Sequence, residues 1–175
     1  MGHELAATPL QLISAHAALA NGGRLIRPRI SLPAKEDSAS DLSRLQQNIV
    51  QEEVAHWVVR EPMRQVVTRG TGRKAQLPGV EVFGKTGTAQ CLSPHGGYLH
   101  GKYISSFVCG APAEDPQLLV LIVVNQAQGR GGETFGGLIA APVASSILQE
   151  SLRYLRVGPS EVAPEWARSP SSTRR

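Results

Sequence analysis

The stretch Gly79–Gln90, GVEVFGKTGTAQ, is compatible with two different folds. Its first eight residues satisfy the phosphate-loop pattern G-x-x-x-x-G-K-[ST], which requires a preceding strand and a helix that opens at the lysine. In such a loop the amides of the helix N-terminus bind a phosphate, and Lys85 would be a nucleotide ligand. The residues between the two glycines, VEVF, alternate instead as in a β-strand. On that interpretation Lys85 lies on the strand itself.

The surrounding residues favour the strand. The four residues between the glycines are bulky, and Glu81 would place a negative charge beside a bound phosphate. After Lys85–Thr86 the chain continues with Gly87–Ala89, which is a poor start for a helix. No apolar strand that ends in an aspartate, as a magnesium ligand requires, follows convincingly. A phosphate-loop nucleotide binder therefore stays only as a remote alternative.

Two more strand candidates follow the motif. The expected strands are Val80–Ala89, Tyr103–Gly110 and Leu118–Asn125, each short, apolar or β-branched, and bounded by Gly, Pro or Asp. The segments between them, Ser93–Lys102 and Ala111–Gln117, suit hairpins and are too short for helical crossovers. The sequence therefore predicts a three-stranded antiparallel sheet.

Helical patterns flank these strands. Thr8–Gln11 forms a capping box with proline at the first helical position, and the helix is expected to end at Asn21–Gly23. A second helical region spans about Gln51–Thr68, where Pro62 should break or kink it. A last helix is expected over Leu138–Leu155, with an apolar side made of Ile139, Val143, Ile147, Leu148 and Leu152. The order of helix, helix, three strands and helix indicates an α+β fold.

The remaining segments have a weaker pattern. Leu25–Ile30 is a short extended candidate, Pro33–Ser43 is expected to be a surface loop, and Gly129–Gly137 a glycine-rich loop. From Gly158 onward Pro, Ser, Glu and Arg dominate, which suggests a mobile tail. We therefore expect one domain over residues 1–157 and a disordered tail over residues 158–175.

Composition excludes several functional classes. The 175 residues are 41% hydrophobic and 18% charged, as in a globular domain. The net charge of +4 is mild and aromatic residues are only 5%, so we expect no nucleic-acid partner. The longest apolar run, Leu118–Val124, is far shorter than a membrane span, and no signal peptide is evident. The scattered histidines have no metal-ligand spacing, and we expect neither a metal nor a cofactor.

The two cysteines, Cys91 and Cys109, do not form a disulfide framework. An oxidising compartment would permit a bond between them if they met in the fold. The sequence does not say whether they do.

Four consecutive residues of the first strand suit the binding of an extended peptide. A strand at the edge of a cleft can pair with a peptide backbone, and Gly87 would let that peptide approach closely. Lys85 supplies positive potential and can relay a proton, while the hydroxyls of Thr86 and Thr88 can bind a carboxylate. The Thr88 amide can donate to an oxyanion. Alone, Lys-Thr-Gly is a weak signal, because threonine is common in strands.

Five segments together resemble class B penicillin-binding proteins, the monofunctional D,D-transpeptidases of septum or side-wall synthesis. In order they are TPLQLISAHAALANGG (Thr8–Gly23), RGTGRKA (Arg69–Ala75), GKTGTAQ (Gly84–Gln90), KYISSFVCGAPAEDPQLLVLIVV (Lys102–Val124) and FGGLIAAPV (Phe135–Val143). Their order and spacing are the family's, and the resemblance covers about Gly2–Leu155. It implies a penicillin-binding and serine β-lactamase-like domain, an antiparallel sheet flanked by helices.

The resemblance also implies a chemistry. Family enzymes acylate a serine with the D-Ala-D-Ala end of a peptidoglycan stem peptide, and β-lactams resemble that dipeptide. Three motifs serve the reaction: Ser-x-x-Lys, Ser-x-Asn and Lys-Thr-Gly. By this resemblance Lys85 assists proton transfer, Thr86 and Thr88 bind the substrate carboxylate, Gly87 allows its approach, and the Thr88 amide donates to the oxyanion.

The chain contains only the third motif. None of its serines begins Ser-x-x-Lys or Ser-x-Asn, and Ser105 and Ser106 are interpreted as structural residues of a strand. In the family both missing motifs precede the helix that begins TPLQ, so this sequence resembles the C-terminal part of a transpeptidase domain. The nucleophile is expected to be absent, which leaves open whether the chain is an enzyme.

Several expectations about partners follow from the resemblance. The family is anchored in the cytoplasmic membrane with this domain outside it, whereas this chain shows no anchor of its own. A separately encoded N-terminal half, or division and elongation proteins, would be partners besides the stem peptide and β-lactams. Without that half, Leu118–Val124 and the last helix are expected to expose apolar surface. The alternative is a non-catalytic module that binds cell-wall peptide or a division partner.

Overall fold

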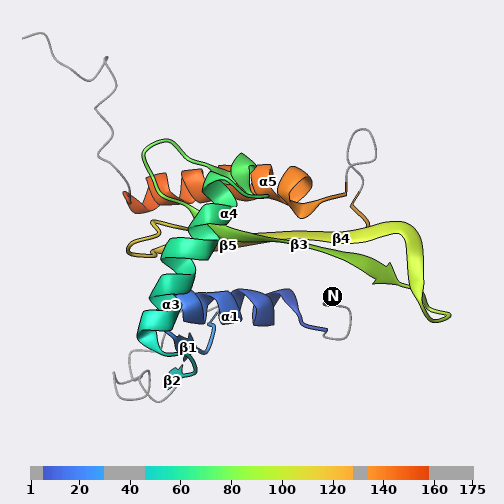
Figure 1. Ribbon diagram of the computed structural model, residues 1–175, viewed down its shortest axis with the longest axis horizontal. Coiled ribbons are helices and arrows are strands. Elements are labelled where there is room, and N and C mark those ends of the chain that lie inside the picture. The colour runs from blue at the N-terminus through green and yellow to red at the C-terminus, as the bar shows by residue number, and fades with distance from the viewer. Residues whose placement is uncertain (1–5, 30–45, 128–133, 158–175) are drawn as a thin grey trace, which may run out of the picture.

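The computed structural model describes residues 6–29, 46–127 and 134–157. In chain order the elements are α1 (Pro9–Ala20), β1 (Arg24–Ile26), β2 (Gln46–Asn48), α3 (Glu52–Val58), the π-helical turn η1 (Val59–Met63), α4 (Arg64–Thr68), the 3₁₀ turn η2 (Arg73–Ala75), β3 (Phe83–Leu92), β4 (Tyr98–Ala111), β5 (Leu118–Val124) and α5 (Gly136–Leu155). They form the predicted α+β fold, with helices on both faces of one sheet (Figure 1).

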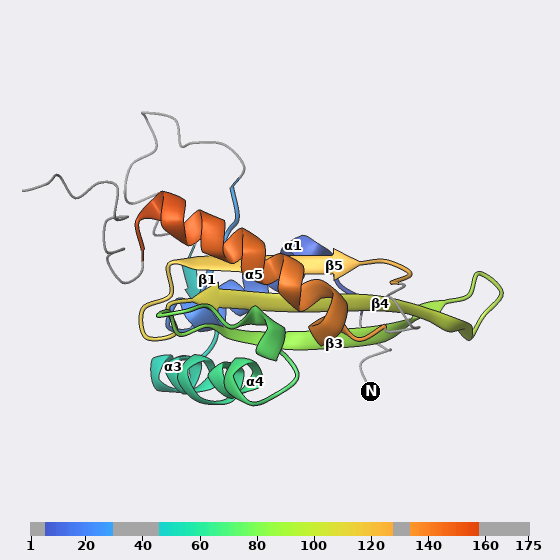
Figure 2. The same ribbon diagram turned by 90° about the horizontal axis from the view of Figure 1, so that it is seen from above.

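The sheet has the predicted antiparallel order β3-β4-β5. Its register pairs Thr86 with Phe107, and Phe107 in turn with Ile122. The strands β3 and β4 continue beyond the helices as a long hairpin (Figure 2). A second, small sheet joins β1, which overlaps the expected extended segment Leu25–Ile30, to β2, which the sequence pattern did not reveal.

The predicted start of β3 is wrong by three residues. The chain turns at Gly79, whose φ of 71° is left-handed, and Val80 forms only an isolated bridge with Leu77. The ladder with β4 therefore begins at Phe83. At the other end β3 extends to Leu92. It finds a partner there because β4 begins at Tyr98, before the apolar residues from which the strand was predicted.

The helix α1 begins as predicted. The Thr8 hydroxyl accepts from the Gln11 amide at 3.2 Å, and the Gln11 side chain accepts from the Thr8 amide at 2.8 Å. This reciprocal capping box satisfies amides that the first helical turn leaves without partners. The helix ends before Gly22 and Gly23, both of which have positive φ.

The second helical region is continuous rather than broken. α3, η1 and α4 follow one another without a gap, and Pro62 lies inside the π-helical turn. A proline has no N–H to donate, and the wider turn accommodates it without ending the helix. Arg60 pairs with Glu114 at 3.1 Å and Arg64 with Glu81 at 2.9 Å. These ion pairs tie the helical region to the segment before β3 and to the connection between β4 and β5.

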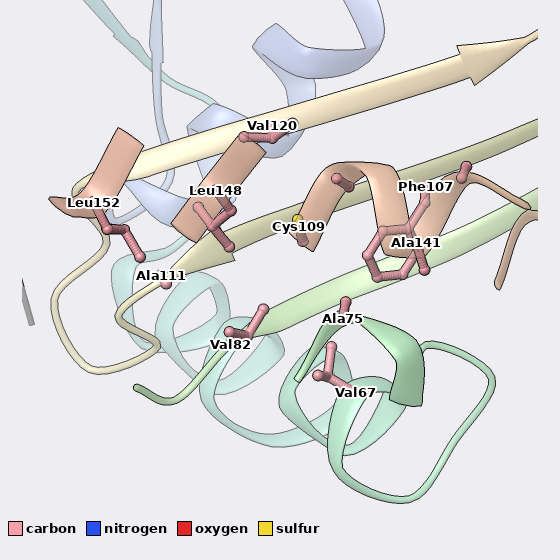
Figure 3. Packing of buried hydrophobic residues seen from close by; sticks show 12 residues of the cluster. Val67, Ala75, Val82, Phe107, Cys109, Ala111, Val120, Ala141, Leu148 and Leu152 are labelled. Carbon is pink, nitrogen blue, oxygen red and sulfur yellow. The ribbon is translucent and has the colours of Figure 1, made fainter. Parts of the chain in front are cut away.

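The helix α5 lies across one face of the sheet and α1 lies below the other (Figures 1 and 2). The core between α5 and the sheet contains Val67, Ala75, Val82, Phe107, Cys109, Ala111, Val120, Ala140, Ala141, Ala144, Leu148 and Leu152 (Figure 3). A smaller cluster on the other face contains Val59, Met63, Phe83, Val108 and Ala113. Together they form the core that positions β3.

The predicted apolar side of α5 is only partly correct. Leu148 and Leu152 are buried, but Val143 and Ile147 are 48% and 44% exposed. The side that faces the sheet is instead lined by glycines and alanines, which allow the helix to approach the strands closely. The helix also begins at Gly136, inside the segment that was expected to be a loop.

Some expectations lie outside the described residues: the loop Pro33–Ser43, residues 129–133 of the glycine-rich loop, and the tail over residues 158–175. Within the described ranges, no helix is long and apolar enough to cross a membrane.

Candidate functional site

The four residues Lys85–Thr88 lie in the middle of β3. β3 is an edge strand of its sheet in the described part of the chain, because only β4 pairs with it. After Thr86 the chain continues as a strand to Leu92 rather than as a helix. A phosphate loop needs a helix to open at this point, so the nucleotide-binding alternative is wrong.

Alternation along β3 separates the four residues onto two faces of the sheet. Thr86 and Thr88 contact residues beside the N-terminus of α5, and we call this side the α5 face. Lys85 and Gly87 lie on the opposite side with Phe83, which packs in the cluster that Leu19 of α1 joins. We call this side the α1 face.

Thr86 is held by a loop that follows α4. Its hydroxyl lies 2.8 Å from the hydroxyl of Thr71, and either oxygen can be the donor. The loop itself is fixed to α4, because the amides of Gly70 and Gly72 donate to the carbonyls of Gln65 and Val66, both at 2.9 Å. Thr71 therefore brings a fixed hydroxyl to the back of the strand.

Thr88 is held by α5. The amide of Gly136, the first residue of this helix, donates to the Thr88 hydroxyl oxygen at 3.3 Å. The N-cap residue Phe135 makes no side-chain hydrogen bond to the first turn of the helix. Thr88 therefore serves as a cap that comes from another element. The N-terminal end of a helix carries a partial positive charge, which this contact places behind the strand.

Glycines make this close packing possible. A Cβ on Gly136 would overlap the Ser106 carbonyl and come within 2.6 Å of the Gly87 carbonyl oxygen. A Cβ on Gly137 would overlap the Thr71 carbonyl and lie 3.2 Å from the Thr86 methyl. The N-terminus of α5 is thus pressed directly against the backbone behind Thr86 and Thr88.

Gly87 has a reason of its own to lack a side chain. It pairs with Ser106, and a Cβ at Gly87 would overlap the Ser106 hydroxyl. Packing within the sheet therefore already favours glycine here, because any side chain would have to displace the Ser106 hydroxyl.

Lys85 is exposed on the α1 face. Its Nζ donates to the Thr86 carbonyl oxygen at 2.8 Å. Within the described residues no acidic side chain is within ion-pairing distance of it. The ammonium group is therefore held by one hydrogen bond and remains available to a negatively charged ligand.

The other candidate nucleophiles are occupied or buried. The Ser105 hydroxyl is buried and donates to the Thr134 carbonyl, which agrees with a structural role. Burial also raises the pKa of the Cys109 thiol to about 12, so Cys109 is a neutral core residue. In the described ranges no three His, Cys, Asp or Glu side chains gather as a metal site would require.

The two cysteines do not meet. Cys109 pairs with Gly84, and Cys91 lies seven residues further along β3. That spacing corresponds to roughly 23 Å at about 3.3 Å per residue, whereas a disulfide needs Cα atoms within about 7 Å. Both thiols are free.

A family model matches most of the chain. The model described as the penicillin binding protein transpeptidase domain matches residues 1–149. The chain belongs to this family. Its three-stranded sheet and flanking helices match solved transpeptidase structures of penicillin-binding proteins.

Among curated relatives of the chain, Stage V sporulation protein D of Bacillus subtilis (strain 168) is 37% identical over 162 residues, which are 90% of this chain and 25% of the relative. The peptidoglycan D,D-transpeptidase FtsI of Escherichia coli (strain K12) is 30% identical over 158 residues, 90% of this chain and 25% of the relative. The chain thus spans about a quarter of the length of these relatives.

Solved structures of penicillin-binding proteins are also similar to this chain. The transpeptidase domain of Burkholderia pseudomallei penicillin-binding protein 3 is 32% identical with a TM-score of 0.76, and covers 91% of this chain and 46% of its own. Penicillin-binding protein 3 of Mycobacterium tuberculosis in complex with ampicillin is 28% identical with a TM-score of 0.74, over 93% of this chain and 38% of its own. The same protein has also been solved with aztreonam. Homologous proteins therefore bind β-lactams.

Sequence reasoning missed three residues of this site: Thr71, Gly136 and Gly137. Thr71 lies in the segment Arg69–Ala75, which sequence resemblance identified only as a loop, and its contact with Thr86 spans 15 residues. The glycine pair directly before an apolar helical pattern could have suggested a helix that begins against a backbone.

Proposed function

We propose that this chain supplies the carboxylate-binding strand of a penicillin-binding D,D-transpeptidase domain. The observation that carries the proposal is the placement of Lys85–Thr88 on an edge strand, with the Thr86 and Thr88 hydroxyls on one face and fixed from behind. The ligands would be the D-Ala-D-Ala end of a stem peptide and β-lactams. A homologous protein has been solved with the β-lactams ampicillin and aztreonam. Family membership supports the same substrate class.

Each of the four residues has a role in this proposal. The Thr86 and Thr88 hydroxyls donate to the ligand carboxylate, and the Lys85 ammonium attracts it and assists proton transfer. Gly87 leaves room for the ligand backbone beside the strand. Such an extended ligand would pair with β3 as an additional strand.

The Thr88 amide is proposed as an oxyanion donor. The Lys85 ammonium reaches the Thr86 carbonyl, which indicates that this carbonyl points toward the open edge of β3. In a strand the N–H and C=O of one residue point to the same side, and the residue two positions further repeats that direction, so the Thr88 amide would face that edge as well. An amide fixed there can stabilise the negative oxygen of a tetrahedral intermediate.

The covalent step needs a group that these 175 residues do not offer. The sequence contains no Ser-x-x-Lys and no Ser-x-Asn. Ser105 is buried against Thr134, and Ser106 lies beneath Gly87 without a lysine or histidine among its hydrogen-bond partners. Because an activated serine needs such a base, we propose that the chain alone is not acylated and that a second polypeptide segment completes the site. The missing motifs also keep a non-catalytic peptide-binding module as the second candidate function.

Fluorescent penicillin tests this proposal. The chain would be incubated with the label alone and together with a separately produced transpeptidase segment that carries Ser-x-x-Lys and Ser-x-Asn. We expect no label on the chain alone, and label on the added segment in the mixture. A Lys85→Ala or Thr86→Val/Thr88→Val chain should abolish that labelling, whereas Lys74→Ala, on η2, should not.

Three outcomes would contradict the proposal. The first is covalent label on the chain alone. The second is label in the mixture that is indifferent to the β3 substitutions. The third is a mixture that forms a stable complex by sedimentation and still takes no label. A complex that binds D-Ala-D-Ala without reacting would favour the non-catalytic module.

A further inference from the structure

The hydroxyls of Thr86 and Thr88 share a feature that the proposed function alone does not require. Each hydroxyl has one proton to donate and two lone pairs that accept. On the α5 face, a second group contacts each oxygen: the Thr71 hydroxyl at 2.8 Å and the Gly136 amide at 3.3 Å. An amide nitrogen can only donate, so at Thr88 the direction of this hydrogen bond is fixed.

We infer that Thr71 and the α5 N-terminus orient the two hydroxyl protons toward the ligand carboxylate, and that Thr71 is a positioning residue of this site. The inference rests on the proposed function, because it assumes that a carboxylate binds Thr86 and Thr88. It adds a residue from a different loop, and it gives the reason why the two hydroxyls act as donors.

The hydrogen-bond directions follow from the inventory of donors. When Thr86 donates its single proton to a carboxylate, it can only accept from Thr71, so Thr71 must be the donor of that pair. Thr88 accepts from Gly136 and likewise has its proton left for the ligand. Each donor behind a hydroxyl polarises it, and chains of hydrogen bonds strengthen one another. Both hydroxyls therefore become better donors to an anion than isolated threonines.

The packing around these contacts supports a fixed arrangement. A Cβ on Gly137 would overlap the Thr71 carbonyl, and a Cβ on Gly72 would overlap the ring of Phe107, which pairs with Thr86 across the sheet. Thr71 is thus held between α5 and the sheet by its own backbone and by its neighbour. Its hydroxyl does not need to be ordered when a ligand binds, which lowers the entropic cost of binding.

The test measures carboxylate preference rather than binding alone. The probes are N-acetyl-D-Ala-D-Ala and its C-terminal carboxamide, titrated into the isotope-labelled full chain by NMR. The ratio of the two dissociation constants reports how well the site recognises negative charge. For the wild-type chain we expect the carboxylate probe to bind at least about tenfold more tightly than the carboxamide, because hydrogen bonds to a charged group are stronger than those to a neutral one.

Thr71→Val removes the hydroxyl and keeps the shape of the side chain. We expect it to reduce the carboxylate preference about fivefold while the affinity for the carboxamide stays nearly unchanged. Thr71→Ser, which keeps the hydroxyl, should restore the preference. Thr68→Val, an exposed threonine at the end of α4, is the matched control and should leave the ratio as in the wild type. Thermal melting of each variant checks that the fold is intact.

The outcomes separate this inference from the proposed function. Equal weakening of both probes by Thr71→Val, or no change in their ratio, would overturn the role of Thr71 and leave the proposed function standing. A Thr71→Ser chain that behaves like Thr71→Val would do the same. A wild-type chain without any carboxylate preference would overturn the proposed function itself.

Discussion

The two faces of the sheet are built differently. On the α5 face, glycines and alanines bring a 20-residue helix against the strands, and the core beneath it is closed. On the α1 face the buried cluster is smaller and is surrounded by the partly buried Leu19, Leu119 and Leu121. β3 presents one kind of group to each: two fixed hydroxyls to the α5 face and one exposed ammonium to the α1 face.

The side chains of β3 differ in how many other elements hold them. Thr86 and Thr88 are held by other elements, through Thr71 and Gly136. Lys85 has only the neighbouring Thr86 carbonyl as a hydrogen-bond partner in the described chain, and a flexible stem. We therefore expect specific hydrogen bonds to a ligand from the α5 face, and long-range attraction from the ammonium group on the α1 face.

The largest expected effect comes from emptying the closed core. Leu148→Ala should lower the free energy of unfolding by about 4 kcal/mol, because this side chain of α5 is fully buried in the core against the sheet and its truncation leaves a cavity. The matched control is Ile147→Ala on the same helix, 44% exposed, which should cost about 1 kcal/mol. Urea unfolding measures both. Equal losses would show that α5 does not pack on the side assigned here.

The next effect tests how tightly α5 approaches the strand. Gly137→Ala should cost about 3 kcal/mol, since the added Cβ overlaps the Thr71 carbonyl and forces the helix away. Gly96→Ala in the β3–β4 hairpin meets no atom within 4 Å and should cost only about 1 kcal/mol, from its positive φ. If both variants unfold at the same urea concentration, the close contact is not a constraint.

A pH dependence follows from the buried Cys109. The folded thiol has a pKa of about 12, raised by burial from an ordinary value of 9.0, so between these values the unfolded chain loses a proton that the folded chain keeps. Stability therefore falls as pH rises through this window, by about 1.4 kcal/mol from pH 8 to pH 10. A Cys109→Ala chain should lack this part of the loss. Parallel curves for the two chains in chemical unfolding would contradict the assignment.

The smallest expected effect on stability is that of Lys85. Lys85→Ala should change the free energy of unfolding by less than about 0.5 kcal/mol, because the side chain is exposed and makes one local hydrogen bond. It should nevertheless weaken binding of N-acetyl-D-Ala-D-Ala, with a smaller effect at high salt. A large loss of stability without loss of binding would place Lys85 in the scaffold instead.

The elements that local pattern determines were predicted well. The capping box of Thr8 and Gln11 and the apolar strand Leu118–Val124 depend on neighbours in sequence, and the structure has both. The three-stranded antiparallel sheet was confirmed. It could be predicted because the connections between its strands are too short for helical crossovers. The placement of Lys85 on a strand was also confirmed, and it could be predicted because the residues after Lys85–Thr86 are a poor helix start.

Features that depend on packing were not predictable. The helical pattern of apolar residues predicted that Val143 and Ile147 face the core. The small residues of α5 pack against the sheet instead, because they permit a closer approach. The contact between Thr71 and Thr86 joins a loop to a strand and leaves no periodic signal. The motif itself was visible in sequence, but the support behind it was not.

The most direct test of the account is the location of the carboxylate on the wild-type chain. Amide resonances would be followed by NMR during titration with N-acetyl-D-Ala-D-Ala and with its carboxamide. The account predicts that the carboxylate shifts the amides of Thr86, Gly87, Thr88 and Gly136 most strongly, and that the carboxamide shifts them much less. Shifts of equal size for both probes, or shifts confined to residues away from β3 and the start of α5, would contradict it.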